Sequence, residues 1–150
     1  MTEPIAALSD ALFAALQNES FVLLHTIDAE TGSPTSNAIS WVYAPNAATL
    51  RFAIDGRSRL VANLAARPDV SVTLFAGGSV HAVYGRAALV KDGLDDVPFR
   101  LVCYDIAIDA VRDAMFYGAR LSTQPEYEKT YDKRAADKLD GQVFAAMKKA

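Results

Sequence analysis

The sequence has few of the residues that build covalent or metal-based sites. Cys103 is the only cysteine among 150 residues, so neither an internal disulfide nor a thiolate metal site is expected. The two histidines, His25 and His81, fall in separate predicted strands without a partner at metal-ligand spacing, which favours structural roles. No Gly-x-Ser-x-Gly motif and no neighbouring cysteine and histidine indicate a hydrolase. We therefore expect no metal site and assign no catalytic residue.

An excess of charge of one sign is also missing. Fifteen basic and eighteen acidic side chains give a net charge of −3, so we expect no nucleic-acid partner. The longest uncharged stretch, residues 31–50, is rich in Ser, Thr, Asn and Pro, and so we expect no membrane association through it. The first residues lack a basic segment followed by an apolar run, which predicts no secretory signal and favours a cytoplasmic location.

Hydrophobic residues make up 51% of the chain, enough for one folded domain over residues 1–150. Apolar residues at helical spacing predict helices at 5–16, 58–66 and 126–149, the last with a possible break at Gly141. Alternating or β-rich runs predict six strands, at residues 21–27, 35–43, 50–55, 70–74, 80–90 and 99–108. Short turns between most of these strands favour a mainly β (α+β) fold built as an antiparallel barrel with flanking helices.

The turn around Arg57, Ser58 and Arg59 concentrates groups that bind anions. It lies between a predicted strand end and the start of a predicted helix. Helix N-terminal N–H groups attract anions, and guanidinium groups add forked hydrogen bonds to phosphate. The same residues in a solvated loop would have no such role. Composition alone leaves both interpretations open.

The order of these local motifs resembles the FMN-binding split-barrel superfamily that includes pyridoxamine 5′-phosphate oxidase. The likeness runs over residues 21–90 and is carried by segments 32–34, 36–41, 50–55, 58–68, 70–75 and 83–87. Segment 127–134 is similar to a subgroup of small bacterial members. The resemblance implies a six-stranded antiparallel split β-barrel, with FMN as cofactor and hydride or electron transfer as chemistry.

The resemblance also implies the positions that contact the cofactor. The strand that holds Asn37, Ala38, Ile39 and Ser40 would lie along the flavin. Backbone groups of Ala53 and Ile54 would touch the isoalloxazine or ribityl part, and Ser58 and Arg59 would match the family's phosphate clamp. Tyr117 would occupy an aromatic position that reaches the flavin of a partner subunit.

Several positions depart from the family pattern. Asn37 stands where a phosphate-binding arginine is common, Leu60 replaces a lysine of the clamp, and Val80 replaces a glutamine beside the flavin. Arg57 is the candidate to compensate for the lost lysine. The oxidase's C-terminal substrate-binding motif has no match after Arg120, so the sequence does not favour oxidation of pyridoxine or pyridoxamine phosphate.

Two functional hypotheses follow. The first is a small FMN-binding oxidoreductase acting on a small-molecule redox substrate, and the second is a split-barrel protein with weak or no flavin affinity that binds another ligand, such as haem or a deazaflavin. Both include a homodimer, because Phe75 and Trp41 place apolar side chains on a second face of their strands. The alternative is that the terminal helices cover that face within one chain.

Overall fold

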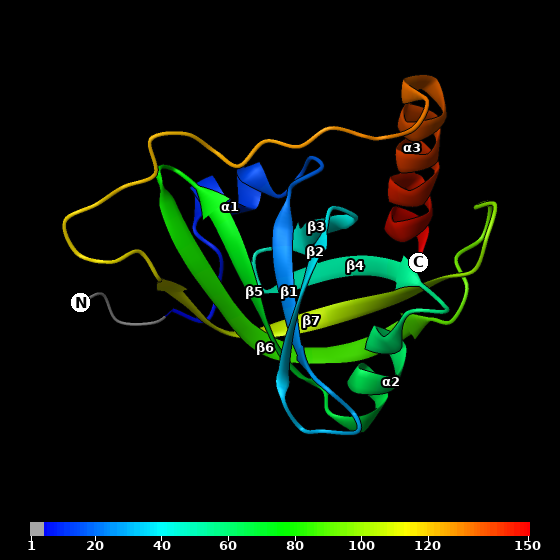
Figure 1. Ribbon diagram of the computed structural model, residues 1–150, viewed down its shortest axis with the longest axis horizontal. Coiled ribbons are helices and arrows are strands. Elements are labelled where there is room, and N and C mark those ends of the chain that lie inside the picture. The colour runs from blue at the N-terminus through cyan, green and yellow to red at the C-terminus, as the bar shows by residue number, and fades with distance from the viewer. Residues whose placement is uncertain (1–4) are drawn as a thin grey trace.

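The structure, a computed structural model, describes residues 5–150 (Figure 1). Within these residues, seven strands and three helices follow one another. In order they are α1 (Asp10–Ala15), β1 (Val22–Ile27), β2 (Pro34–Ile39), β3 (Val42–Asn46), β4 (Thr49–Asp55), α2 (Arg59–Ala66), β5 (Asp69–Ala76), β6 (Ser79–Lys91), β7 (Leu101–Asp113) and α3 (Lys133–Lys149).

The strands form one antiparallel sheet in the order β2-β1-β5-β6-β7-β4-β3, with β2 and β3 at its two open edges. The expected α+β class and antiparallel pairing are confirmed, whereas the expected count of six strands is wrong. The predicted strand at 35–43 is two strands, because the chain leaves β1 after Ile39 and pairs with β4 from Val42 onward. One continuous β-rich run therefore supplies both edges of the sheet.

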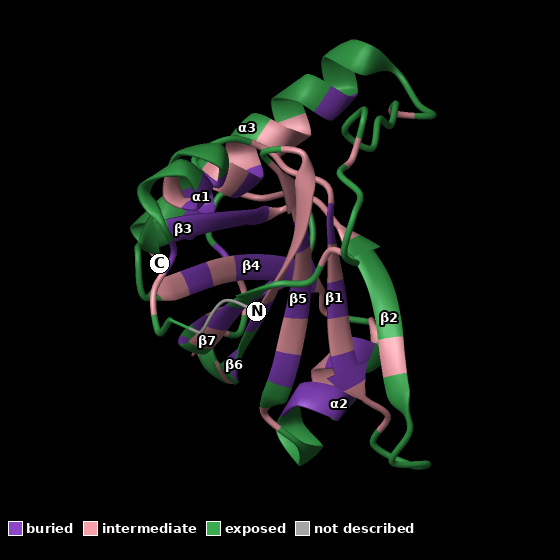
Figure 2. Cartoon of the chain, turned by 90° about the vertical axis from the view of Figure 1, so that its left-hand side faces the viewer, coloured by how far each residue is buried: buried purple, intermediate pink, exposed green. Residues whose placement is uncertain are grey.

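Alternation along the strands divides the apolar side chains between two cores. Leu50, Phe52 and Ile54 of β4 point into the main core inside the curved sheet, where α1 and α2 also contribute buried leucines. Ala53 of the same strand points outward, into a second core that α3 covers with Val143 and Met147. Figure 2 shows the buried bands alternating along β4 and β5, while most of the edge strand β2 is exposed.

The terminal helices are shorter than predicted. Ser9 caps α1 by accepting a hydrogen bond from the backbone N–H of Leu12, and Ile5 instead bridges to Val111 of β7. Asp132 caps α3, so the helix predicted at 126–149 begins only at Lys133 and runs through Gly141 without a break. None of the helices within residues 5–150 has the length and apolar character needed to span a bilayer.

Residues 114–132 form an irregular segment, here named the strap, that crosses from the end of β7 to α3 (Figure 1). The backbone N–H of Leu121 donates to the carbonyl of Gly78 over 2.6 Å, which ties the strap to the β5–β6 turn. Farther along, Tyr127 packs against Phe21 with ring centroids 5.7 Å apart, and Phe21 packs against Phe75. Phe75 is therefore half-buried against Phe21, and a pocket lies between it and Tyr127 of the strap.

Candidate functional site

An open cleft of about 330 Å³ lies where the sheet fails to close, between β2 on one side and β4 with the start of α2 on the other. This volume is at the lower end of the range typical of small-molecule sites. The cleft is lined by Asn37, Ala38, Ile39, Ser40, Trp41, Ala53, Ile54, Asp55, Ser58 and Leu60. Seven of the ten residues that the sequence predicts for cofactor binding thus meet in one place. Their role in cofactor binding stays a prediction.

One wall of the cleft is formed by β2, an edge strand that, within residues 5–150, pairs with β1 on one side only. An edge strand presents N–H and C=O groups that can pair with another molecule. Asn37 and Ala38 are both exposed at this wall. The wall therefore offers donors and acceptors to the edge of a planar heterocycle, whatever the side chains are.

The opposite wall has a polar and an apolar end. At the polar end Ser58 caps α2, and its hydroxyl accepts the N–H of Leu60 over 3.1 Å, which leaves the hydroxyl hydrogen able to donate. At the apolar end the N–H of Ala53 donates to the carbonyl of Trp41 over 3.1 Å. An amphipathic ligand with an anionic tail would place that tail at Ser58, toward the positive end of the α2 dipole.

The two arginines of the predicted clamp stand beside the cleft and contact carboxylates. Arg57 is 91% exposed and pairs with Asp55 over 3.1 Å, and Arg59 is 75% exposed and pairs with Asp28 over 2.8 Å. Hydrogen bonds from Arg57 lower the pKa of Asp55, and backbone N–H groups of the β1–β2 turn, followed by the charge of Arg59, lower the pKa of Asp28. Each arginine therefore faces a charged carboxylate that offsets its attraction for a phosphate.

Tyr117 and Val80 lie away from this cleft. Tyr117 is fully exposed on the strap, beyond the end of β7, whereas the cleft adjoins the start of that strand through the pairing of Ala53 with Cys103. Val80 pairs with Phe75 at the β5–β6 turn. A contact of Tyr117 with flavin therefore requires a second subunit and stays a prediction.

Both histidines contact hydrogen-bonding groups of the sheet. His25 lies 2.8 Å from the hydroxyl of Thr73 through Nε2 and 3.0 Å from that of Ser36 through Nδ1. His81 lies 3.2 Å from the carbonyl oxygen of Ala76 through Nε2.

Sequence reasoning missed Trp41 as a lining residue and missed its anchor. The indole Nε1 donates to Asp140 of α3 over 2.9 Å. Trp41 ends a segment that was matched to the family, so its place in the cleft could have been inferred. The link to Asp140 joins residues 99 apart in sequence, and no local pattern indicates it.

Comparison with known proteins gives one family. The sequence matches the family described as pyridoxamine 5′-phosphate oxidase over residues 8–134. No curated protein matches it.

Solved structures share the fold at low sequence identity. A Lactobacillus delbrueckii protein, provisionally named as a pyridoxamine 5′-phosphate oxidase, superposes with a TM-score of 0.61 at 15% identity, over 74% of this chain and 99% of its own. HupZ of Group A Streptococcus gives 0.61 at 10% identity, over 77% and 99% of the two chains. A structure named F420 reductase gives 0.56 at 19% identity, over 66% and 94%. At such identities these likenesses establish a shared fold.

Proposed function

The chain belongs to the pyridoxamine 5′-phosphate oxidase family, and from this premise we propose that it is a small flavoprotein that binds FMN in the cleft between β2 and β4 and acts as an oxidoreductase. The observation that carries the proposal is the meeting of Asn37–Ser40, Ala53, Ile54 and Ser58 around one open cleft. These groups offer an edge-strand backbone to a ring system and a capped helix start to a phosphate.

Each part of the cleft has a distinct task in this proposal. FMN, when bound, supplies the hydride or electron transfer. The Ser58 hydroxyl and the start of α2 hold the phosphate, while backbone groups along β2 orient the ring system. Leu60 and Trp41 keep water away from the apolar parts of the ligand. Of the ten lining residues Asp55 alone is ionisable, and its carboxylate is already paired with Arg57, so the cleft itself does not define the substrate.

The proposal includes a homodimer that completes the site. Trp41 and Phe75 suggested surplus apolar surface, but Trp41 packs against the second core beside α3 and Phe75 is half-buried against Phe21. Other large apolar side chains are exposed and would be buried in a dimer, namely those of Tyr84, Leu89, Phe116 and Tyr117. Sedimentation equilibrium at low micromolar concentration tests it: a species near the chain mass of 16.1 kDa that binds FMN fully would refute the shared site.

A comparison of FMN with riboflavin tests the cofactor assignment. We expect FMN to bind more tightly, because only FMN carries a phosphate for Ser58. Ser58→Ala should weaken FMN binding and leave riboflavin binding unchanged. Ser9→Ala is the matched control, since it removes the equivalent cap from α1, away from the cleft. Equal affinity for both flavins, or none for either, would contradict the proposal.

A second candidate is a deazaflavin or another ligand in the same cleft. The pairing of Arg57 with Asp55 and of Arg59 with Asp28 favours another ligand that does not depend on a phosphate contact, because both pairs reduce the attraction for an anionic group. A deazaflavin is suggested separately, by the fold shared with a structure named F420 reductase. The visible absorption spectrum of the freshly purified protein separates flavin, deazaflavin and haem.

A further inference from the structure

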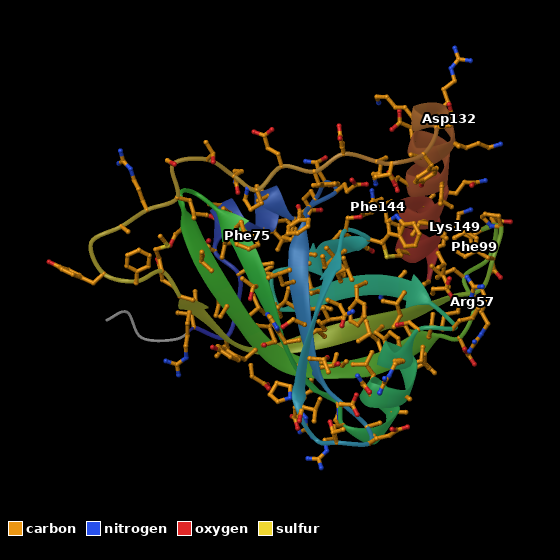
Figure 3. The ribbon with its side chains drawn as sticks, in the orientation of Figure 1. Arg57, Phe75, Phe99, Asp132, Phe144 and Lys149 are labelled. Atoms are coloured by element: carbon orange, nitrogen blue, oxygen red, sulfur yellow. The ribbon has the colours of Figure 1, made fainter. Side chains whose placement is uncertain are left out.

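Trp41 joins the cleft to the far C-terminal part of the chain. Trp41 is one of the residues that line the cleft, and its side chain is half-buried against the second core. The ring lies 6.5 Å from that of Phe99, at an angle of 39°. Figure 3 places Phe99 beside the C-terminal end of α3, and Phe144 on the side of α3 that faces the sheet. The indole is therefore packed between the cleft and α3.

A short polar chain fixes the orientation of this indole. Asp140 accepts the indole N–H over 2.9 Å and the ammonium of Lys129 over 2.9 Å. Lys129 also pairs with Glu19 over 3.2 Å, and the hydroxyl of Tyr127 donates to the same carboxylate. We name the set of Glu19, Lys129, Asp140 and Trp41 the clasp.

The clasp is sheltered, which distinguishes it from a surface ion pair. Lys129 is 25% exposed, and Glu19 and Asp140 are 24% and 16% exposed. Burial alone would raise the pKa of Asp140, but hydrogen bonds from Trp41 and Lys129 outweigh it and lower that pKa. Burial and the bond to Glu19 raise the pKa of Tyr127 to about 12, so its hydroxyl stays protonated and donates. The lowered pKa of Asp140 keeps its carboxylate charged, as an acceptor of both the indole N–H and the Lys129 ammonium.

From this geometry we propose that Trp41 is the specificity-determining wall at the ring end of the cleft, and that Asp140 and Lys129 are positioning residues that hold it there. Ser58 marks the anion end, and the bond from Ala53 to Trp41 marks the opposite end. An indole held at that end presents a flat apolar face, which selects a planar ring over a flexible or branched group. The ligand part of this inference rests on the proposed function.

The chain carries its own probe, because Trp41 is its only tryptophan. In the ligand-free protein, Asp140→Ala should shift Trp41 emission to the red and make it at least about twofold more accessible to acrylamide, since the freed indole samples other rotamers. Asp140→Asn keeps an acceptor for the indole and should stay near the wild type. Asp137→Ala is the matched control, because Asp137 lies on the same helix in an exposed pair with Lys133. Lys129→Met tests the clasp from the strap, in case Asp140→Ala unfolds α3.

FMN titrations then test the wall. Asp140→Ala and Trp41→Phe should each weaken FMN binding by about three- to tenfold. Their double variant should cost no more than either alone, because both remove the same contact. The clasp is refuted if Asp140→Ala and Lys129→Met both show the same Trp41 emission and acrylamide quenching as Asp137→Ala. The wall is refuted if the losses in FMN affinity of Asp140→Ala and Trp41→Phe add up in the double variant. A wild-type protein that binds no FMN refutes the proposed function and the wall together, while the acrylamide data still decide the clasp.

Discussion

The ion pair between Arg59 and Asp28 predicts that a mutation of Asp28 strengthens FMN binding instead of weakening it. Asp28 uses its two oxygens differently: Oδ1 accepts the backbone N–H groups of Glu30 and Thr31 over 2.9 Å, and Oδ2 accepts Arg59 over 2.8 Å. Asparagine can keep the first two bonds with its amide oxygen and present an NH₂ group to the guanidinium. Asp28→Asn should therefore preserve the turn and release Arg59 toward the cleft.

The size of the effect follows from the exposure of the pair. Because Arg59 is 75% exposed, its pair with Asp28 has the strength of a surface ion pair. Asp28→Asn removes this competition for the guanidinium, so FMN should bind about two- to fivefold more tightly. Riboflavin, which lacks the phosphate, should bind as before. The gain should shrink as salt is raised, because the Debye length falls to about 10 Å at 0.1 M. Flavin fluorescence titration of both ligands measures all three expectations.

A matched control separates this local effect from the general loss of a negative charge. Asp69→Asn removes one carboxylate from another exposed pair, with Arg86 of β6, and should leave FMN affinity unchanged. Weaker FMN binding by Asp28→Asn would mean that Asp28 holds Arg59 in its binding position. Unchanged binding would mean that Arg59 never reaches the phosphate. Either result refutes the reasoning.

Three further predictions concern stability and pH. Gly85→Ala should lower the free energy of unfolding in urea by about 2 kcal/mol or more, because the added methyl meets the β7 backbone, whereas Gly93→Ala meets nothing and should stay within about 0.5 kcal/mol. Asn63→Ala should cost about 2–3 kcal/mol in the same assay, since Asn63 is 3% exposed and satisfies a backbone N–H and a buried hydroxyl. Asp140, which faces Lys129 and Glu19, has a lowered pKa in the folded protein. Its charged carboxylate therefore stabilises the fold and holds Trp41 at pH values above the ordinary aspartate pKa, and this stabilisation is lost as the pH falls through the lowered pKa. Trp41 emission should accordingly be constant from about pH 8 to 5 and change only below about pH 4, and a change near pH 6 would refute this.

The local half of this fold could be predicted from the sequence. Alternation in 50–55, the Ser58 cap and the turn at Gly77–Gly78 act between near neighbours, and the corresponding elements β4, α2 and the β5–β6 hairpin are all present. The departure of the chain from β1 at Ser40 could not be predicted, because residues on both sides of it suit a strand equally well. Each half pairs with its neighbour in sequence, β2 with β1 and β3 with β4. The two halves lie at opposite edges because β1 pairs with β5 and β4 pairs with β7, both distant in sequence.

The candidate site divides in the same way. Asn37–Ser40, Ala53, Ile54 and Ser58 reach the cleft through the strands and cap that the sequence indicates. The partners of Arg57 and Arg59 were not anticipated, since charge patterns do not tell a solvated arginine from one paired with a nearby carboxylate. Tyr127 is a further example: its spacing fits a helical stripe, yet it lies in the strap because Asp132 starts α3 later.

The order of pairing in the sheet also determines when the cleft can exist during folding. β4 ends at Asp55, but its partner strand β7 begins only at Leu101. The hydrogen bond of Trp41 likewise needs Asp140, which lies 99 residues later. Contacts between such distant segments form slowly, because the entropy of closing a long loop is lost before the contacts stabilise the structure. During synthesis the nascent chain therefore completes both walls of the cleft only after α3 has emerged. A ligand that binds in the cleft would therefore stabilise only chains in which α3 is already present, and would not stabilise shorter nascent chains.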